Sequence, residues 1–100
     1  MNEVLRTFEF RKIYDASDKR EKDFIDNIKN QLHENLNVGR PLKFDWFREK
    51  RFENKRLYYL INRLTKKAIF VAFGSKKEQQ KIVDHIITNK ARYLKKIESK

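Results

Sequence analysis

Two clusters of basic residues in the second half of the chain could hold a phosphate group. The first lies within 45–62, a segment rich in aromatic residues, and the second begins two residues after Gly74. Arginine offers a permanently charged fork that fits a phosphate, and free backbone N–H groups at a helix start also attract anions. The clusters consist of Arg48, Lys50, Arg51, Lys55 and Arg56, and of Lys76 and Lys77.

These residue types permit one metal-free reaction at a phosphodiester. In RNA the ribose 2′-hydroxyl can attack the adjacent phosphate, provided that protein groups align the atoms, remove the 2′ proton and stabilise the added charge. Arginine suits the stabilisation, and a lysine crowded by other cations can serve as the base. DNA lacks the 2′-hydroxyl, so such a site would select RNA. The alternative is a solvated strand face on which Glu49 and Glu53 pair with these cations.

The residues needed for cysteine catalysis, for a Gly-rich phosphate loop and for a metal site are absent from the sequence. The chain has no cysteine, and it contains neither a Gly-rich phosphate loop nor a cluster with metal-ligand spacing. Its two histidines, His33 and His85, fall on separate predicted helices and are expected at the surface. The sequence therefore predicts no metal and no cofactor.

The net charge of +11 is concentrated in one part of the chain. Residues 1–38 carry 7 Lys/Arg and 8 Asp/Glu, whereas residues 39–100 carry 18 and 6. Such segregation indicates a polyanionic partner, and a basic surface kept for solubility is the alternative. Hydrophobic residues make up 39%, and no apolar run approaches the roughly 18 residues of a membrane span. We expect one folded domain over 1–100, in the cytoplasm and with no membrane partner.

Hydrophobic periodicity predicts the elements that must position these residues. Alternation predicts a first strand over 3–10, followed by a weak helical stretch over 11–16. A second helix begins after an N-cap pair, Asp18 and Glu21, and ends near 37–39. Three strands follow over 45–52, 55–62 and 67–73; Gly74 ends the last of them, and a capping box over 75–78 opens a final helix over 76–97.

The resulting order is β-α-α-β-β-β-α. Short connections make the last three strands an antiparallel meander, and the first strand must pair with it. The predicted fold class is therefore α+β: a small, mostly antiparallel sheet flanked by helices.

Three motifs in this order resemble the RelE/ParE toxin superfamily of toxin–antitoxin systems, and its RelE-like branch in particular. They are the turn Gly-Arg-Pro-Leu over 39–42, the strand Arg-Leu-Tyr-Tyr over 56–59, and Gly74 followed two residues later by Lys76. The opening strand and the helix around Phe24 also fit, so the resemblance spans essentially the whole chain.

The resemblance implies a function. RelE-like toxins are metal-independent endoribonucleases, or mRNA interferases, that cleave mRNA in the ribosomal A site and so inhibit translation. The partners implied are mRNA, ribosomal RNA and an acidic, helix-rich antitoxin that covers the basic surface. The catalytic residues implied are Arg56, Lys76, Lys50 and Arg48, with Arg51 as a rival for the last two; the RNA-binding residues implied are Arg51, Lys55, Lys77, Lys81 and Tyr58.

The chain departs from RelE at two positions. Lys76 stands where RelE has an arginine, and Ile82 stands where RelE has its C-terminal tyrosine, while Tyr93 lies further along the chain. Two alternatives therefore remain beside the endoribonuclease: a ParE-like toxin that acts on DNA gyrase, and a non-catalytic relative that binds nucleic acid.

Overall fold

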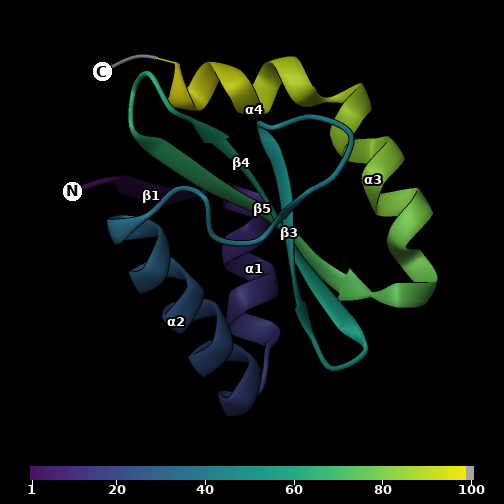
Figure 1. The fold of residues 1–100 in the computed structure, drawn as a ribbon. Coiled ribbons are helices and arrows are strands. Elements are labelled where there is room, and N and C mark those ends of the chain that lie inside the picture. Colours follow the sequence, from purple (N-terminus) through teal and green to yellow (C-terminus); the bar gives the residue numbers. More distant parts are fainter. Residues whose placement is uncertain (99–100) are drawn as a thin grey trace.

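A five-stranded sheet forms the centre of the protein in the computed structural model, which describes residues 1–98 (Figure 1). The strands follow the spatial order β1-β5-β4-β3-β2. Neighbouring strands are antiparallel except β1, which runs parallel to β5. The strands are β1 (Glu3–Arg6), β2 (Arg40–Pro41), β3 (Phe47–Phe52), β4 (Lys55–Asn62) and β5 (Lys67–Ser75). The predicted α+β class is confirmed, and the short β2 is an additional strand.

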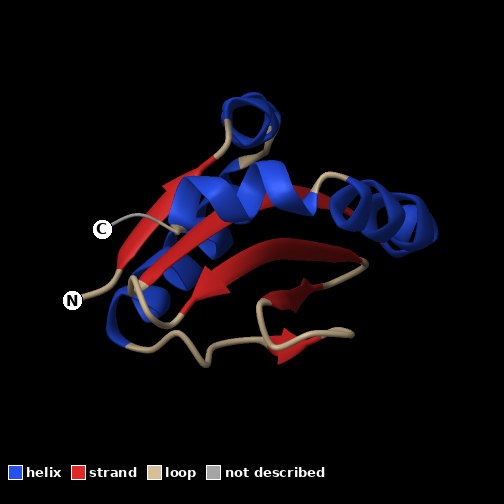
Figure 2. Cartoon of the chain, turned by 90° about the horizontal axis from the view of Figure 1, so that it is seen from above, coloured by secondary structure: helices blue, strands red, loops and turns tan. Residues whose placement is uncertain are grey.

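Helices pack around the twisted sheet (Figure 2). They are α1 (Phe8–Ala16), α2 (Lys19–Glu34), the 3-10 turn η1 (Lys76–Glu78), α3 (Gln79–Thr88) and α4 (Lys90–Ile97). Within residues 1–98, no helix is long and apolar enough to cross a membrane.

The sheet separates two hydrophobic layers. Beneath α1 and α2, Phe10, Ile28 and Leu32 pack against Leu57, Tyr59 and other side chains of β4 and β5. On the opposite face, Ile86, Tyr93 and Ile97 pack against a second group that contains Phe47, Tyr58, Leu60 and Ile69. The central strands are therefore buried on both sides, as the nearly continuous apolar sequence of β5 predicts.

The predicted strand over 3–10 is wrong beyond Arg6. The side chain of Thr7 accepts a hydrogen bond from the backbone N–H of Phe10 over 3.0 Å and so caps α1, which begins at Phe8. Phe10 enters the core from this helix, while Phe8 stays exposed. A cap of this kind satisfies backbone N–H groups that would pair with a neighbouring strand if the segment were extended. The alternation of polar and apolar residues does not show that such a cap is present.

Four other boundaries differ from the prediction. Strand β3 begins at Phe47 rather than at 45. Helix α2 begins with the predicted capping box at Asp18 but ends at Glu34, before the predicted 37–39. Strand β5 continues through Gly74, which pairs with Arg56, rather than ending there. The final helix is broken at Asn89 and opens with the 3-10 turn η1, so Lys76 precedes the α-helical geometry by one turn.

Candidate functional site

The register of β3 against β4 decides which predicted site residues share a face. Arg56 lies directly opposite Arg51, and Tyr58 lies opposite Glu49. Residues that face each other across two strands project from the same side of a sheet. Tyr58 belongs to the core beneath α3 and α4. Glu49, Arg51 and Arg56 therefore project toward that side as well.

Glu49 and Arg56 form an ion pair inside the protein. Their side chains are only 7% and 6% exposed, and Nε of Arg56 lies 3.5 Å from Oε2 of Glu49. The carboxylate has two further partners: Arg40 donates to Oε1 over 2.8 Å, and Gln79 donates to Oε2 over 3.3 Å. Strands β2, β3 and β4 and helix α3 thus each supply one group. Breaking a buried ion pair is costly, so Glu49 and Arg56 form a fixed centre that Arg40 and Gln79 contact.

Two buried polar atoms beside this centre have no hydrogen-bond partner within residues 1–98. They are Nε of Arg56 and the phenol oxygen of Tyr58. A buried polar group left without a partner costs about 1–3 kcal/mol, and such groups in native structures require an explanation. Nε of Arg56 is the atom that forms the ion pair with Glu49, at 3.5 Å and without the geometry of a hydrogen bond.

The phenol of Tyr58 predicts how stability depends on alkaline pH. Burial, followed by the charge of Glu49, raises the pKa of Tyr58 to about 12. An unfolded tyrosine ionises near pH ~10, so the folded state holds this proton more tightly. The stability it contributes is complete below pH ~10 and is lost as the pH rises through the folded pKa. In urea denaturation, the free energy of unfolding of Tyr58→Phe is therefore expected to fall less between pH ~10 and ~12 than that of the wild type.

Tyr59→Phe is the neighbouring comparison for this experiment. Burial raises the pKa of Tyr59 as well, so its phenol contributes its own share of the alkaline loss. An identical loss in the wild type and in Tyr58→Phe would contradict the role assigned to Tyr58.

Two open depressions, connected through Glu49 and Gln79, form one basic surface. The first, about 510 Å³ in volume, is lined by Gly39, Arg40, Glu49, Lys50 and Arg51. The second, about 460 Å³, is lined by Leu42, Lys43, Lys76, Lys77, Gln79, Gln80 and Val83. Gln79 joins them, since it lines the second and donates to Glu49, which lines the first. We call the combined surface the basic groove; its exposed cations are Arg40, Lys43, Arg51, Lys76 and Lys77.

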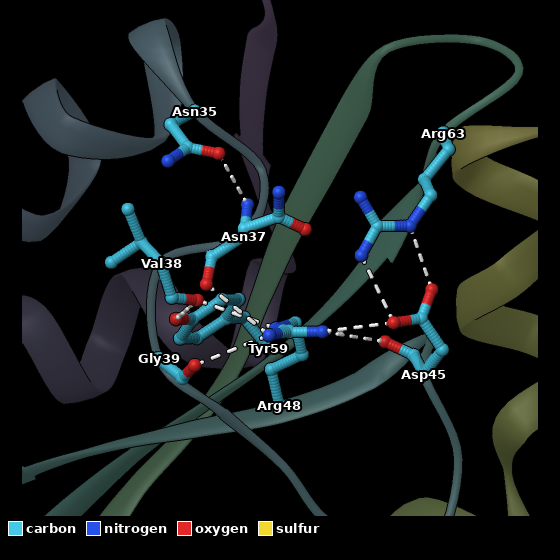
Figure 3. Close-up of polar contacts among 8 residues, drawn as sticks. All are labelled: Asn35, Asn37, Val38, Gly39, Asp45, Arg48, Tyr59 and Arg63. Carbon is cyan, nitrogen blue, oxygen red and sulfur yellow. Dashed lines mark hydrogen bonds and ion pairs between the residues drawn. The ribbon is translucent and has the colours of Figure 1, made fainter.

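Arg48 lies on the opposite face of the sheet from Arg56, and its guanidinium is used inside the protein (Figure 3). The residue is 5% exposed and donates to four backbone carbonyls in the segment that leads into β3. The acceptors are the carbonyls of Asn37, Val38, Gly39 and Asp45, at 3.2–3.3 Å. Arg48 also contacts the carboxylate of Asp45. It therefore holds the 37–45 segment in place and cannot join Arg56 at a phosphate.

A surface ion pair completes this arrangement. Arg63 donates twice to the carboxylate of Asp45, at 2.7 and 2.9 Å (Figure 3). Hydrogen bonding from Arg63 holds the pKa of Asp45 below its ordinary value. The segment before β3 is thus fixed at both of its ends.

The remaining predicted residues are dispersed. Strand alternation turns the Lys50 side chain toward the α2 side, away from Arg56, although Lys50 lines the groove at the sheet edge. Lys55 pairs with Glu21 of α2 and lies over Phe73. Lys81 lines a separate, more apolar depression between α1 and α3. Tyr58 is fully buried and therefore presents no ring to RNA.

Neither tyrosine nor histidine replaces the residue that RelE-like toxins carry at the end of the sheet. Ile82 occupies the sequence position of that tyrosine, and its Cδ1 lies 2.5 Å from the point where a Cβ on Gly74 would be. Tyr93 is 3% exposed and lies under the guanidinium of Arg92. His85 lines the same apolar depression as Lys81, and His33 contacts the backbone carbonyl of Asn2 at the other end of the molecule.

The sequence analysis expected Glu49 only as an ion-pair partner of the cations, which the structure bears out, and it did not single out Arg40, Lys43 or Gln79 as site residues. Glu49 carries a usable signal, because it lies two residues after Phe47 and two before Arg51 and so shares their face. Its burial depends on Arg40 and Gln79, which come from distant parts of the chain and leave no local pattern.

No cluster of three or more potential metal ligands occurs in the part of the chain that the structure describes. Comparisons with family models, with curated proteins and with solved structures found no match for this chain. The geometry of the basic groove is therefore the basis for assigning a function.

Proposed function

We propose that this protein is an RNA-cleaving toxin of the RelE-like kind, which inhibits translation by cutting mRNA on the ribosome. The observation that carries the proposal is the buried ion pair of Glu49 and Arg56, a carboxylate and a guanidinium side by side, of which Glu49 lines the basic groove. A carboxylate can accept a proton and a guanidinium can stabilise a phosphate, so the pair brings together the two functions that RNA cleavage needs.

The proposed reaction uses the ribose 2′-hydroxyl as its nucleophile. Glu49 accepts the 2′ proton while the 2′-oxygen bonds to phosphorus, and Arg56 stabilises the extra negative charge on the phosphate oxygens. The bond from phosphorus to the 5′-oxygen then breaks, that oxygen takes a proton from water, and the hydroxide so formed takes the 2′ proton from Glu49, which restores the carboxylate. The products are a 2′,3′-cyclic phosphate and a 5′-hydroxyl. The side chain of Lys50, one of the catalytic residues that the resemblance implies, turns to the other side of the sheet, and Glu49 is the base in this proposal.

An incoming phosphate also frees the base. In the protein alone, Glu49 accepts hydrogen bonds from Arg40 and Gln79. The side chain of Arg40 is 72% exposed, so a phosphate in the groove competes for it. Arg40 then binds the phosphate, and one oxygen of Glu49 becomes free to accept the 2′ proton.

The exposed cations fit the proposed partners. Lys76, Lys77, Lys43 and Arg51 supply phosphate contacts that hold mRNA and ribosomal RNA without reading their sequence. The same surface suits an acidic antitoxin, which would cover it in the cytoplasm until the toxin is released.

Replacing Glu49 by glutamine tests the proposal directly. The amide cannot accept the 2′ proton, so we expect Glu49→Gln to lower the single-turnover cleavage rate by about 10²-fold, within the usual range for a general base. RNA affinity should stay the same or increase, because a negative charge leaves the groove. The measurement uses purified protein and mRNA, with and without ribosomes, and analyses the ends for cyclic phosphate.

Glu53→Gln is the matched control. Glu53 is a carboxylate on the turn after β3, it is half exposed, and its partner is Arg20 of α2. It should cleave at the wild-type rate. The proposal is refuted if the wild type cuts no RNA, with or without ribosomes. In that case, inhibition of gyrase supercoiling would favour the ParE-like alternative. RNA binding without cleavage would favour the non-catalytic alternative.

A further inference from the structure

Three aromatic rings form a stacked ladder in the segment that leads into β3. Phe44 stacks on Trp46 with ring centroids 4.9 Å apart and planes 8° apart, and Trp46 stacks on Phe47 at 5.8 Å and 16°. Phe47 is fully buried, whereas Phe44 is 39% exposed. The ladder thus starts in the core and ends at the surface with an accessible ring.

The exposed end of the ladder lies beside the basic groove. Lys43, the residue before Phe44, lines the groove together with Lys76 and Lys77. Nζ of Lys90 lies over the Phe44 ring, 5.9 Å from its centre. The loop between β2 and β3 runs past the junction of α3 and α4, on the side of the sheet that carries Arg56 (Figure 1).

We propose that Phe44 is a stacking platform for one unpaired base of a single-stranded RNA whose phosphates lie in the basic groove. Proteins bind single strands by combining a positively charged path for the backbone with aromatic rings on which bases stack. A base on Phe44 would add a fourth ring to a ladder that is already parallel, with Lys43 and Lys90 as neighbouring cations.

Phe8 shows that exposure of an aromatic ring is not enough. It is 65% exposed, and Lys12 lies 4.9 Å from its ring centre. However, no other ring stacks on it within residues 1–98, and it belongs to α1, across the sheet from the basic groove. Phe8 is therefore a matched control: an exposed phenylalanine with a lysine partner and without the ladder.

This inference rests on the proposed function, because it assumes that RNA occupies the groove. Trp46 is the only tryptophan in the chain, so its fluorescence reports on the ladder itself. The probes are a single-stranded oligoadenylate of about eight nucleotides, 2′-O-methylated so that it cannot be cleaved, and the same backbone without bases. Fluorescence anisotropy of labelled probes gives the affinities.

The wild type is expected to bind the oligoadenylate about tenfold more tightly than the abasic strand, with a change in Trp46 fluorescence. Phe44→Ala should lose that tenfold preference and keep its affinity for the abasic strand, Phe44→Leu should behave in the same way, and Phe8→Ala should match the wild type. A wild type that binds both probes equally, or a Phe44→Ala variant that keeps the preference, overturns the platform while RNA binding in the groove stands. Absence of binding to either probe overturns the platform and the proposed function together.

Discussion

A variant with both Arg56→Ala and Lys76→Ala is expected to cleave RNA about 10⁴-fold more slowly than the wild type, because removal of one group that stabilises transition-state charge typically costs about 10²–10³-fold. Arg56 is the buried guanidinium paired with Glu49, and Lys76 is an exposed cation of the basic groove. Expression of the double variant should no longer arrest growth. Single-turnover cleavage and growth curves measure the two effects.

Two controls separate chemistry from folding and from bulk charge. Arg56→Lys keeps a cation beside Glu49 but loses the fork, so it should fold normally and cleave about 10²-fold more slowly than the wild type. Arg11→Ala with Lys12→Ala removes the same charge from exposed positions on α1, across the sheet, and should leave cleavage unchanged. Growth arrest that survives in the Arg56 and Lys76 double variant would show that the site is assigned wrongly.

Gly39→Ala is expected to destabilise the protein by about 4 kcal/mol, from left-handed backbone strain and from overpacking together. Gly39 has φ +86°, and a Cβ at this position would stand 2.0 Å from the phenol oxygen of Tyr59 and 2.7 Å from the carbonyl oxygen of Glu49. The second contact is with backbone, which cannot move without disturbing β3. Urea denaturation at neutral pH measures the loss as a lower transition midpoint.

Gly74→Ala is the informative comparison. A Cβ there would meet Cδ1 of Ile82 at 2.5 Å, but this atom is the end of a flexible side chain, and the φ angle of Gly74 is not in the left-handed region. We expect a loss of about 1 kcal/mol, at the low end for overpacking. A Gly39→Ala protein no less stable than Gly74→Ala would mean that the backbone at Gly39 relaxes freely.

The elements with strong local signals are predictable from the sequence. Strand β4 has the predicted bounds, since its aromatic and β-branched residues lie between two tight turns. The capping box at Asp18 and Glu21 marks the start of α2 in the same way. The start of α1 at Phe8 is not predictable from alternation, because the Thr7 cap competes with an equally plausible strand pattern.

The candidate site is less predictable than the fold, because side chains alternate between the two faces of a strand. In β3, Arg48 and Lys50 lie on one face and Glu49 and Arg51 on the other. A shift of one residue in the pairing of β3 would exchange the two faces. Motif spacing alone does not define that register. Glu49 also becomes a buried carboxylate only when distant residues close over it.

The parallel pairing of β1 with β5 has a consequence for how the chain acquires its structure. Strands β3, β4 and β5 are joined by short turns and can pair through local contacts. Strand β1 must instead pair across a long separation in sequence, because Glu3 lies opposite Lys67. Closing so long a loop costs entropy before any contact repays it, and non-local pairings of this kind slow folding. During synthesis, β1 has no strand to join until β5 has left the ribosome. Residues 1–75 must therefore have been synthesised before the sheet can close.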